Sequence, residues 1–369
     1  MSMSPPALPP FWTIWWRSID RWSLVSVLIL MGLGVWLIME STPAIALQHN
    51  WTPFLLLKRH FMIVGPSLVL LVATSCLQRN SILKIALATG LLAWLGIWAV
   101  SIWGVEIKGA RRWLSIGSFS LQPSEFLKPA LSIAVAYVLS YPLHFLFSGA
   151  LIALAIMPLF LQPDLGMIVV MCIVWFGQCF VGGLPWIWTI GAMTSAVFAG
   201  AGVYLCFPHA AYRIQTFLSG ADQDPLGSQY QVTQALKSFS SGGWLGKGPG
   251  AGSILNVLPD AHADFIFAVA GEEMGLLFCI GIVILYAILL WRFFLHAFQE
   301  IDQFHALAIV GLGMQIILQA LLNMASVLRM IPTKGVTLPF ISYGGSSLLS
   351  LCWAMGLLLA LTRRYRRLI

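Results

Sequence analysis

Hydrophobic residues run along the chain in long blocks that shorter polar stretches separate. A block of about 18 or more mostly apolar residues is long enough to cross a bilayer as a helix. We identify about ten such blocks and expect a membrane-spanning helix in each. They lie at approximately 22–40, 60–77, 83–103, 124–141, 145–161, 165–183, 186–206, 264–291, 303–327 and 338–362. The pattern therefore predicts an all-α integral membrane protein.

The charges at the two ends of the chain predict its orientation. An even number of spans places both termini on one side, and basic residues favour the cytoplasmic side. Arg17, Arg21 and the "RRYRR" segment at 363–367 therefore predict that both termini are cytoplasmic. We expect a cytoplasmic tail at 1–21, a single membrane domain at 22–362 and a basic cytoplasmic tail at 363–369.

One long polar stretch, 207–263, separates the seventh and eighth predicted helices and forms a large periplasmic loop in this topology. Its middle part, "SQYQVTQALKSF" at 228–239, is typical of an amphipathic helix on the membrane surface. The following "GGWLGKGPGAG" at 242–252 indicates irregular backbone and lacks the order of a nucleotide-binding P-loop. We leave two alternatives open: a flexible connector, or backbone amides that hold a phosphate together with Lys247.

Composition supports the membrane assignment and excludes the soluble classes. Hydrophobic residues make up 59% of the chain and charged residues only 9%, whereas soluble domains have about 25% charged residues. The six cysteines lack the paired spacing of metal sites. We interpret them as small buried hydrophobic residues rather than as a disulfide framework.

Basic residues are unusually frequent on the predicted outer face. The topology places nine of the 20 Lys and Arg inside and eleven outside, against the usual bias. An anionic ligand such as a phosphate would explain this excess; the alternative is that some of these residues are snorkelling anchors at helix ends. The eleven are Lys58, Arg59, Lys108, Arg111, Arg112, Lys128, Arg213, Lys237, Lys247, Arg329 and Lys334.

Asp264 lies where the polar loop meets the eighth predicted helix. Partial loss of water at this boundary would suit a carboxylate that acts as a general base. The alternative is a plain N-cap, because Asp favours that position for structural reasons alone.

Asp260, His262 and Asp264 alternate at a spacing that could place oxygen and nitrogen ligands around one divalent cation, Mg²⁺ or Mn²⁺. The pattern is weak by itself, since loops often contain such residues. We expect no organic cofactor. Further along the same block, Glu272 and Glu273 favour a structural hydrogen-bonding or ion-pairing role.

Three more polar insertions lie on the predicted outer face, at 106–130, 161–166 and 328–349. Small residues within 342–347 would also permit close helix packing. Together, the insertions would bring carboxylates and cations to the mouths of several helices, which suits a lipid with an anionic head group. The charged or hydroxyl residues that we select from them are Arg111, Arg112, Glu125, Lys128, Asp164, Lys334 and Ser342.

Several long motifs resemble one protein family throughout the chain. They are "KGARRWLSIGSFSLQPSEFLKPA" (108–130), "QPDLG" (162–166), "DPLGSQYQVTQAL" (224–236), "GGWLGKG" (242–248), "LPDAHADFIFAVAGEEMG" (258–275) and "PTKGVTLPFISYGGSSLL" (332–349). On these motifs the chain resembles the shape, elongation, division and sporulation family of membrane glycosyltransferases. The short distance from "GKGPG" to "LPDAHADF" is more similar to the division branch than to the elongation branch.

The resemblance implies ten transmembrane helices and polymerisation of lipid II into β-1,4 glycan strands at the outer face of the inner membrane, during septal cell-wall synthesis. It implies that Asp264 is the catalytic carboxylate and that Arg59, Glu125, Lys128 and Asp164 line the same cavity. The residues that we expect to bind substrate are Arg59, Arg111, Arg112, Glu125, Lys128, Asp164, Arg213, Lys247, His262, Lys334 and Ser342.

This chain departs from the family pattern at two positions. The family usually has Thr where this chain has Ala263, and Thr or Ser where it has Met167. Each lost hydroxyl neighbours an important acid, but both acids remain, so we expect activity to be retained.

The resemblance also implies partners: lipid II and undecaprenyl-pyrophosphate-linked glycan, a class B penicillin-binding protein, other division membrane proteins and membrane lipid, but no nucleic acid. Three alternatives remain at this stage. The chain could be a lipid II translocase without chemistry, a non-enzymatic scaffold that activates the penicillin-binding protein, or a polymerase of the elongation type.

Overall fold

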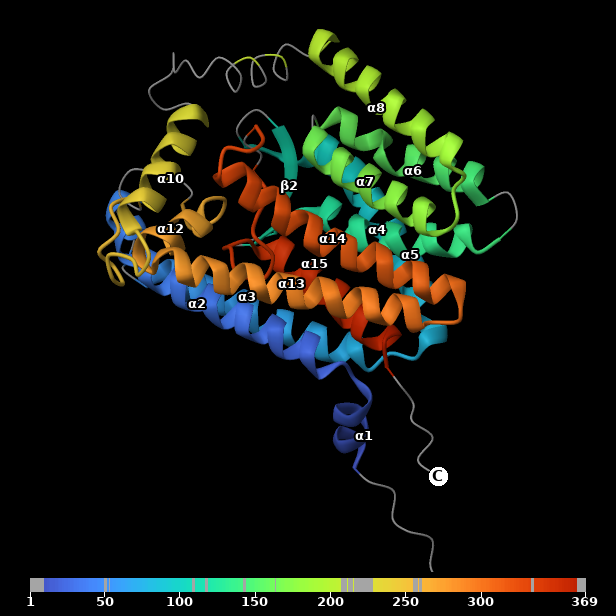
Figure 1. The fold of residues 1–369 in the computed structure, drawn as a ribbon, viewed down its shortest axis with the longest axis horizontal. Coiled ribbons are helices and arrows are strands. Elements are labelled where there is room, and N and C mark those ends of the chain that lie inside the picture. The colour runs from blue at the N-terminus through green and yellow to red at the C-terminus, as the bar shows by residue number, and fades with distance from the viewer. Residues whose placement is uncertain are drawn as a thin grey trace, which may run out of the picture.

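The computed structural model describes residues 10–49, 52, 54–107, 110–116, 119–141, 144–162, 164–206, 211, 215, 228–254, 258, 261–332 and 335–363. Long helices run side by side across the molecule and a small antiparallel sheet lies among them (Figure 1). In the first half of the chain the elements are α1 (Phe11–Ser18), α2 (Arg21–His49), α3 (Leu55–Ser75), α4 (Arg79–Trp103), β1 (Val105–Ile107), β2 (Ala110–Ile116), β3 (Phe119–Leu121) and α5 (Pro123–Leu139).

The second half of the chain continues in the same way. Its elements are α6 (His144–Leu161), α7 (Leu165–Val181), α8 (Trp186–Cys206), α10 (Ser228–Gly242), α12 (Ile266–Glu273), α13 (Gly275–Gln299), α14 (Gln303–Val327) and α15 (Gly345–Leu361). Within the described residues, five helices are long and apolar enough to cross a membrane, and three shorter apolar helices accompany them. The all-α integral membrane class is therefore confirmed, while the number of crossings stays a prediction.

Each of the ten predicted blocks contains helix, but two of them are not continuous. The block at 264–291 is divided between α12 and α13, with the break at Gly275. The block at 338–362 becomes helical only at Gly345, and the residues before it form turns. The sequence also did not predict the three strands, which pair in the order β1-β2-β3 directly before α5.

The break between α12 and α13 has a steric cause. Gly275 has φ +82°, a left-handed conformation that favours glycine. A Cβ atom there would overlap the backbone of Trp244, Leu245 and Gly246. The Gly-rich segment 242–248 therefore packs directly on the break and is not a loose connector.

Hydrogen bonds fix this segment further. The amides of Lys247 and Gly248 donate to the carbonyl oxygens of Glu272 and Glu273, at 3.0 and 2.9 Å. These two amides are consequently unavailable to a phosphate. The helix predicted at 228–239 exists as α10, and its buried Val232 and Ala235 belong to the protein core beside α12.

Replacing Gly275 by Ala is expected to lower the free energy of unfolding by about 1–3 kcal/mol, because the backbone must move or hold a strained φ. Gly281, on α13, is the matched control: nothing lies within 4 Å of a Cβ placed there. Gly281→Ala should change stability by less than about 1 kcal/mol. Thermal unfolding of the purified variants in detergent measures both, and equal melting temperatures would contradict the steric explanation.

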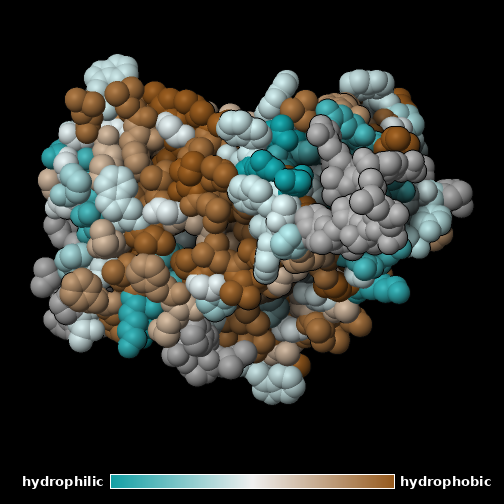
Figure 2. Space-filling model, turned by 90° about the horizontal axis from the view of Figure 1, so that it is seen from below, coloured by the Kyte–Doolittle hydropathy of each residue, from teal (hydrophilic) through white to brown (hydrophobic). Residues whose placement is uncertain are grey.

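The core of the bundle lies around α15, which is buried along nearly its whole length and packs on α3, α5 and α14. By contrast, α8 lies at the edge, with large exposed side chains such as Trp186, Phe198 and Leu205. Figure 2 shows broad apolar surface across the left and centre of one face, with hydrophilic residues at its left edge and to the right of its centre. This distribution is what a lipid-facing helical bundle requires.

Ion pairs tie the helices together at the end of α13 that is remote from Asp264. The Arg292 guanidinium donates to Asp20 at 3.0 and 2.7 Å, and His296 lies 3.1 Å from the same carboxylate. Arg79 makes two 3.0 Å hydrogen bonds to Glu300. Because α13 has 25 residues, its two ends lie roughly 37 Å apart, and Arg292 and His296 lie in its last third, away from Asp264.

Candidate functional site

Asp264 ends a turn, Ala261–Asp264, that immediately precedes α12, and its side chain is half-buried. The N-cap residue of α12 is Phe265, so the plain N-cap alternative is not supported. Gly335 lies against the carboxyl group: a Cβ there would be 3.1 Å from Oδ2 of Asp264. The Tyr343 amide donates to the His262 carbonyl at 3.1 Å. Residues 335–343, which lead into α15, therefore cover the Asp264 turn, and we call them the covering segment.

Two amide side chains on α14 hold this segment in place. Asn323 donates from Nδ2 to the carbonyl oxygens of Asp264 (2.9 Å) and Val336 (2.6 Å). Gln319, one turn earlier, donates from Nε2 to the carbonyl and hydroxyl oxygens of Thr337, both at 3.2 Å. Neither residue was selected from the sequence.

A buried ion pair lies on the other side of Gln319. Lys128 and Glu125, on the first turns of α5, are 2.9 Å apart, with side chains only 5% and 10% exposed. The Lys128 ammonium also donates to Oε1 of Gln319 at 3.0 Å. Polar contacts thus run from Lys128 through Gln319 and residues 336–337 to the backbone of Asp264.

Asp164 and Arg112 extend this cluster toward the small sheet. Arg112, on β2, has Nε 3.8 Å from Oδ2 of Asp164 and donates to the Gln162 carbonyl at 3.1 Å. Asp164 is the N-cap of α7 and accepts from the Met167 amide at 3.3 Å. Burial raises the pKa of Asp164 above its usual range, while the positive charge of Arg112 acts against that rise.

Asp164→Asn is expected to raise the melting temperature more at pH 7 than at pH 4. Asn retains the cap, and a raised folded-state pKa means that wild-type stability is lost as pH rises from the unfolded value, 3.8, through the folded one. Asn does not ionise, so the variant does not lose stability in this way as the pH rises. Melting temperatures of both proteins between pH 4 and pH 8 measure the difference, which should grow with pH; a constant difference would contradict the raised pKa.

His262 and Arg59 meet at Tyr343. The ring centroids of His262 and Tyr343 are 5.3 Å apart, and the His60 ring centroid lies 5.8 Å from that of Tyr343. The charge of Arg59 also acts on Tyr343. The structure therefore brings His262 and Arg59 to the same covering segment as Asp264.

Three other predicted residues have different surroundings. Arg111 pairs with Glu106 at 3.5 Å on the exposed β1–β2 hairpin. Lys247 pairs with Glu272 at 2.6 Å beside α12, which gives Glu272 the structural role expected of it. The Ser342 hydroxyl accepts from the Leu338 amide at 2.8 Å within a buried turn. Arg213, Lys334 and Asp260 lie outside the described residues.

The predicted metal site stays a prediction. Within the part of the chain that the structure describes, no group of three or more His, Cys, Asp or Glu residues could hold a metal ion. Asp260, one of the three proposed ligands, is not among those residues. Among the described residues, Lys128 and Arg112 are cations that form ion pairs within the cluster.

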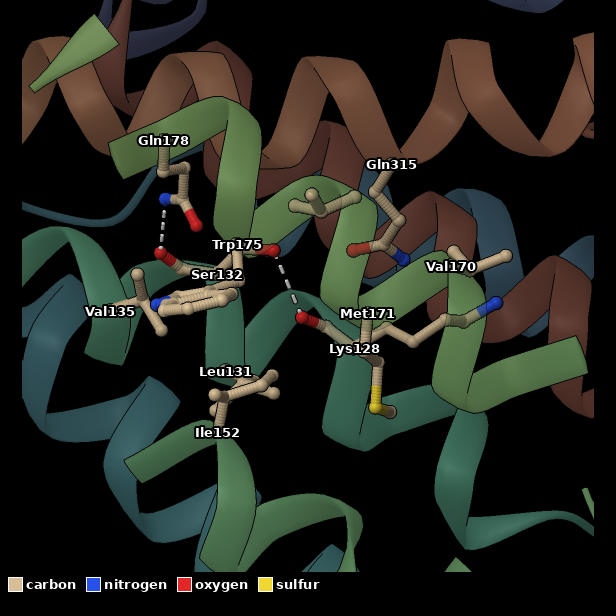
Figure 3. A pocket seen from close by; sticks show the side chains of 11 residues that line it. Lys128, Leu131, Ser132, Val135, Ile152, Val170, Met171, Trp175, Gln178 and Gln315 are labelled. Atoms are coloured by element: carbon tan, nitrogen blue, oxygen red, sulfur yellow. Dashed lines mark hydrogen bonds between the residues drawn. The ribbon is translucent and has the colours of Figure 1, made fainter. Parts of the chain in front are cut away.

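A small internal space lies below Lys128, between α5, α6, α7 and α14 (Figure 3). Gln178 closes one side of it by donating to the carbonyls of Ser132 (2.7 Å) and Leu307 (3.0 Å). Gln315, on α14, also lines this space, and its buried amide has no hydrogen-bond partner among the described residues. Most of the side chains that line this space next to the polar cluster are therefore apolar.

The fold and the site define a multi-pass helical membrane protein with a carboxylate and a buried ion pair at one end of its bundle. A family model described as "Cell cycle protein", for FtsW, RodA and SpoVE, matches residues 21–367. The chain belongs to this family, as the motifs indicated.

Curated relatives are similar over nearly the whole chain. A probable peptidoglycan glycosyltransferase FtsW from Caulobacter vibrioides is 37% identical, covering 95% of this chain and 91% of the relative. The protein of the same name from Thioalkalivibrio sulfidiphilus is 34% identical, covering 94% and 90%.

Solved structures show the same fold. A chain from a peptidoglycan synthase complex that coordinates polymerisation and crosslinking is 27% identical, with a TM-score of 0.80 over 94% of this chain and 98% of that one. The rod shape determining protein RodA of Thermus thermophilus is 26% identical, with a TM-score of 0.68 over 94% and 97%.

Proposed function

We infer that this chain is a peptidoglycan glycosyltransferase of the FtsW type, which polymerises lipid II into β-1,4 glycan strands during septal cell-wall synthesis. The relatives' names support this activity. The observation that carries the inference is the Asp264 carboxyl group, held at one end of the bundle in a cluster that also contains the buried Lys128–Glu125 pair.

The chemistry needs one base and one stabilised leaving group. The Asp264 carboxylate accepts the proton of the N-acetylglucosamine 4-hydroxyl of the incoming lipid II. The freed oxygen attacks the anomeric carbon of the growing chain. The new C–O bond forms as the bond to the lipid pyrophosphate breaks, and the configuration inverts. The proton stays on Asp264 until it is released to water.

The departing pyrophosphate takes the electron pair and needs positive charge. Lys128 and Arg112 are the cations of the cluster, and Arg59 lies near Tyr343. Such fixed charges stabilise a developing anion without rearrangement. A divalent cation could assist them, and Asp260, His262 and Asp264 are its proposed ligands.

The setting follows from the same family. We propose that both termini are cytoplasmic, that the Asp264 end is periplasmic and that the protein works at the division septum of the inner membrane. A class B penicillin-binding protein is the proposed partner, supported by the similarity to a chain of a peptidoglycan synthase complex.

The polar contacts also bear on the alternatives. A translocase would need polar groups through the depth of the membrane; the space below Lys128 does carry the polar side chains of Ser132, Gln178 and Gln315, but its other lining residues apart from Lys128 are apolar. The ionic groups at the opposite end, Asp20, Arg292 and His296, pair with one another. This separation favours chemistry at one end over transport between the two.

Purified protein in liposomes, with labelled lipid II and with or without the cognate transpeptidase, tests the activity. We expect a ladder of glycan products that a muramidase digests. Movement of labelled lipid II between leaflets without any polymer would instead support the translocase, and neither polymer nor movement would support the scaffold.

A further inference from the structure

We propose that Gln319 and Asn323 are positioning residues that hold Asp264 at a fixed distance from the Lys128–Glu125 pair. They do so through residues 335–337, which lie between the two. This inference rests on the proposed function, because it assigns the two amides a role in that reaction.

Asn323 fixes the Asp264 side of the site. It is 1% exposed, and its one NH₂ group donates to two backbone carbonyls, those of Asp264 and Val336. These carbonyls belong to segments that are far apart in sequence. The covering segment is therefore held against the catalytic turn, with Gly335 next to the carboxyl group because a side chain would crowd Oδ2.

Gln319 holds the side of the site that contains Lys128. It is 2% exposed, accepts from the Lys128 ammonium and donates toward Thr337 and the Ser347 hydroxyl. The Thr337 and Ser347 hydroxyls are themselves 2.8 Å apart. Gln319 thus links α5 to the covering segment and to the start of α15.

A carboxamide meets both requirements at position 319, since its oxygen accepts from the ammonium while its nitrogen donates. A carboxylate would lack the donor, and an apolar side chain would lack both. Displacement of a reacting group by about 1 Å can cost about 100-fold in rate. We therefore expect loss of these contacts to lower kcat more than it raises KM.

Gln315 supplies a matched control on the same helix, one turn before Gln319. It is 1% exposed, and its amide has no hydrogen-bond partner within the described residues. Substitution by Met removes the amide at either position and keeps a similar volume. A general effect of changing a buried Gln on α14 would appear in both variants.

The first experiment compares Gln319→Met and Gln315→Met in the lipid II polymerisation assay. We expect kcat to fall by about 10- to 100-fold for Gln319→Met, with KM changed by less than about threefold, and little change for Gln315→Met. Equal loss in both variants, or none in either, would overturn the proposal for Gln319.

Asn323→Asp provides a pH signature that a packing role would not give. An ionised Asp cannot donate to the two carbonyls, whereas a protonated one donates a single hydrogen bond. The ratio of variant to wild-type activity should therefore rise by at least about threefold from pH 8 to pH 5.5. A ratio that is independent of pH, in a variant that still folds, would overturn the proposal for Asn323.

Hydrogen exchange separates this proposal from the proposed function, since it needs no activity. Amides of residues 335–343 should exchange at least about tenfold faster in Gln319→Met than in wild type, and at the wild-type rate in Gln315→Met. Unchanged exchange in Gln319→Met would overturn the positioning role. Absence of polymer from the wild type would instead count against the proposed function alone.

Discussion

Asp264→Asn is expected to remove polymer formation from the purified protein while leaving it folded and able to bind lipid II. The amide has the size of the carboxyl group but cannot accept the proton of the attacking hydroxyl. Loss of a general base typically costs about 10²- to 10⁴-fold in rate. The glycan ladder should therefore fall below detection, while retention of labelled lipid II by the immobilised variant stays near the wild-type level.

Asp302→Asn is the matched control for this variant. Asp302 is the N-cap of α14, is largely exposed and accepts from the His305 amide at 2.9 Å. Asn caps helices as well as Asp does, so this variant should polymerise at the wild-type rate. Polymer made at that rate by Asp264→Asn would show that another group accepts the proton.

The second large effect concerns stability. Lys128→Met is expected to lower the free energy of unfolding by about 3–5 kcal/mol, because it leaves the buried Glu125 carboxylate without its counter-charge. A large fall in melting temperature in detergent measures the loss. Arg111→Met removes a cation from the exposed pair with Glu106 and should shift the melting temperature only slightly.

A double variant distinguishes charge from packing. Glu125→Gln combined with Lys128→Met removes both charges, so it should recover part of the lost stability. Recovery will be incomplete because Gln319 still loses the donor that Lys128 supplied. If the double variant is less stable than Lys128→Met, the cost lies in packing rather than in the uncompensated charge.

The helices were predictable because a bilayer requires long apolar runs, and each of those runs contains helix. The break in the helix at Gly275 could not be predicted in this way, because it is caused by contact with the backbone of residues 244–246, which are far away in sequence. The hydrophobic run simply continues across it. The strands at 105–121 were missed because the prediction relied on runs of apolar residues, and this polar segment has none.

The charged residues of the site could be selected from the sequence, whereas its neutral amide residues, Gln319 and Asn323, were not selected. Glu125, Lys128, Asp164 and Arg112 were selected as charges that a membrane protein rarely places without reason, and the structure brings them together. The same criterion also selected Lys247, whose charge is paired with Glu272 beside α12.

The two amides of α14 could have been found from their spacing. Gln315, Gln319 and Asn323 recur every four residues in the mostly apolar helix α14, which places them on one face. That spacing identifies a polar stripe but not its partners. Only the structure shows that Gln319 and Asn323 bind the covering segment while Gln315 does not.

The most direct test of the proposed reaction is a structure of the Asp264→Asn variant with lipid II bound. We predict that the diphosphate lies beside Lys128 and Arg112, with the sugar hydroxyl that becomes the nucleophile about 3 Å from residue 264. A diphosphate held by Arg79 and Arg292 at the opposite end of the bundle, or a hydroxyl remote from residue 264, would contradict the assignment.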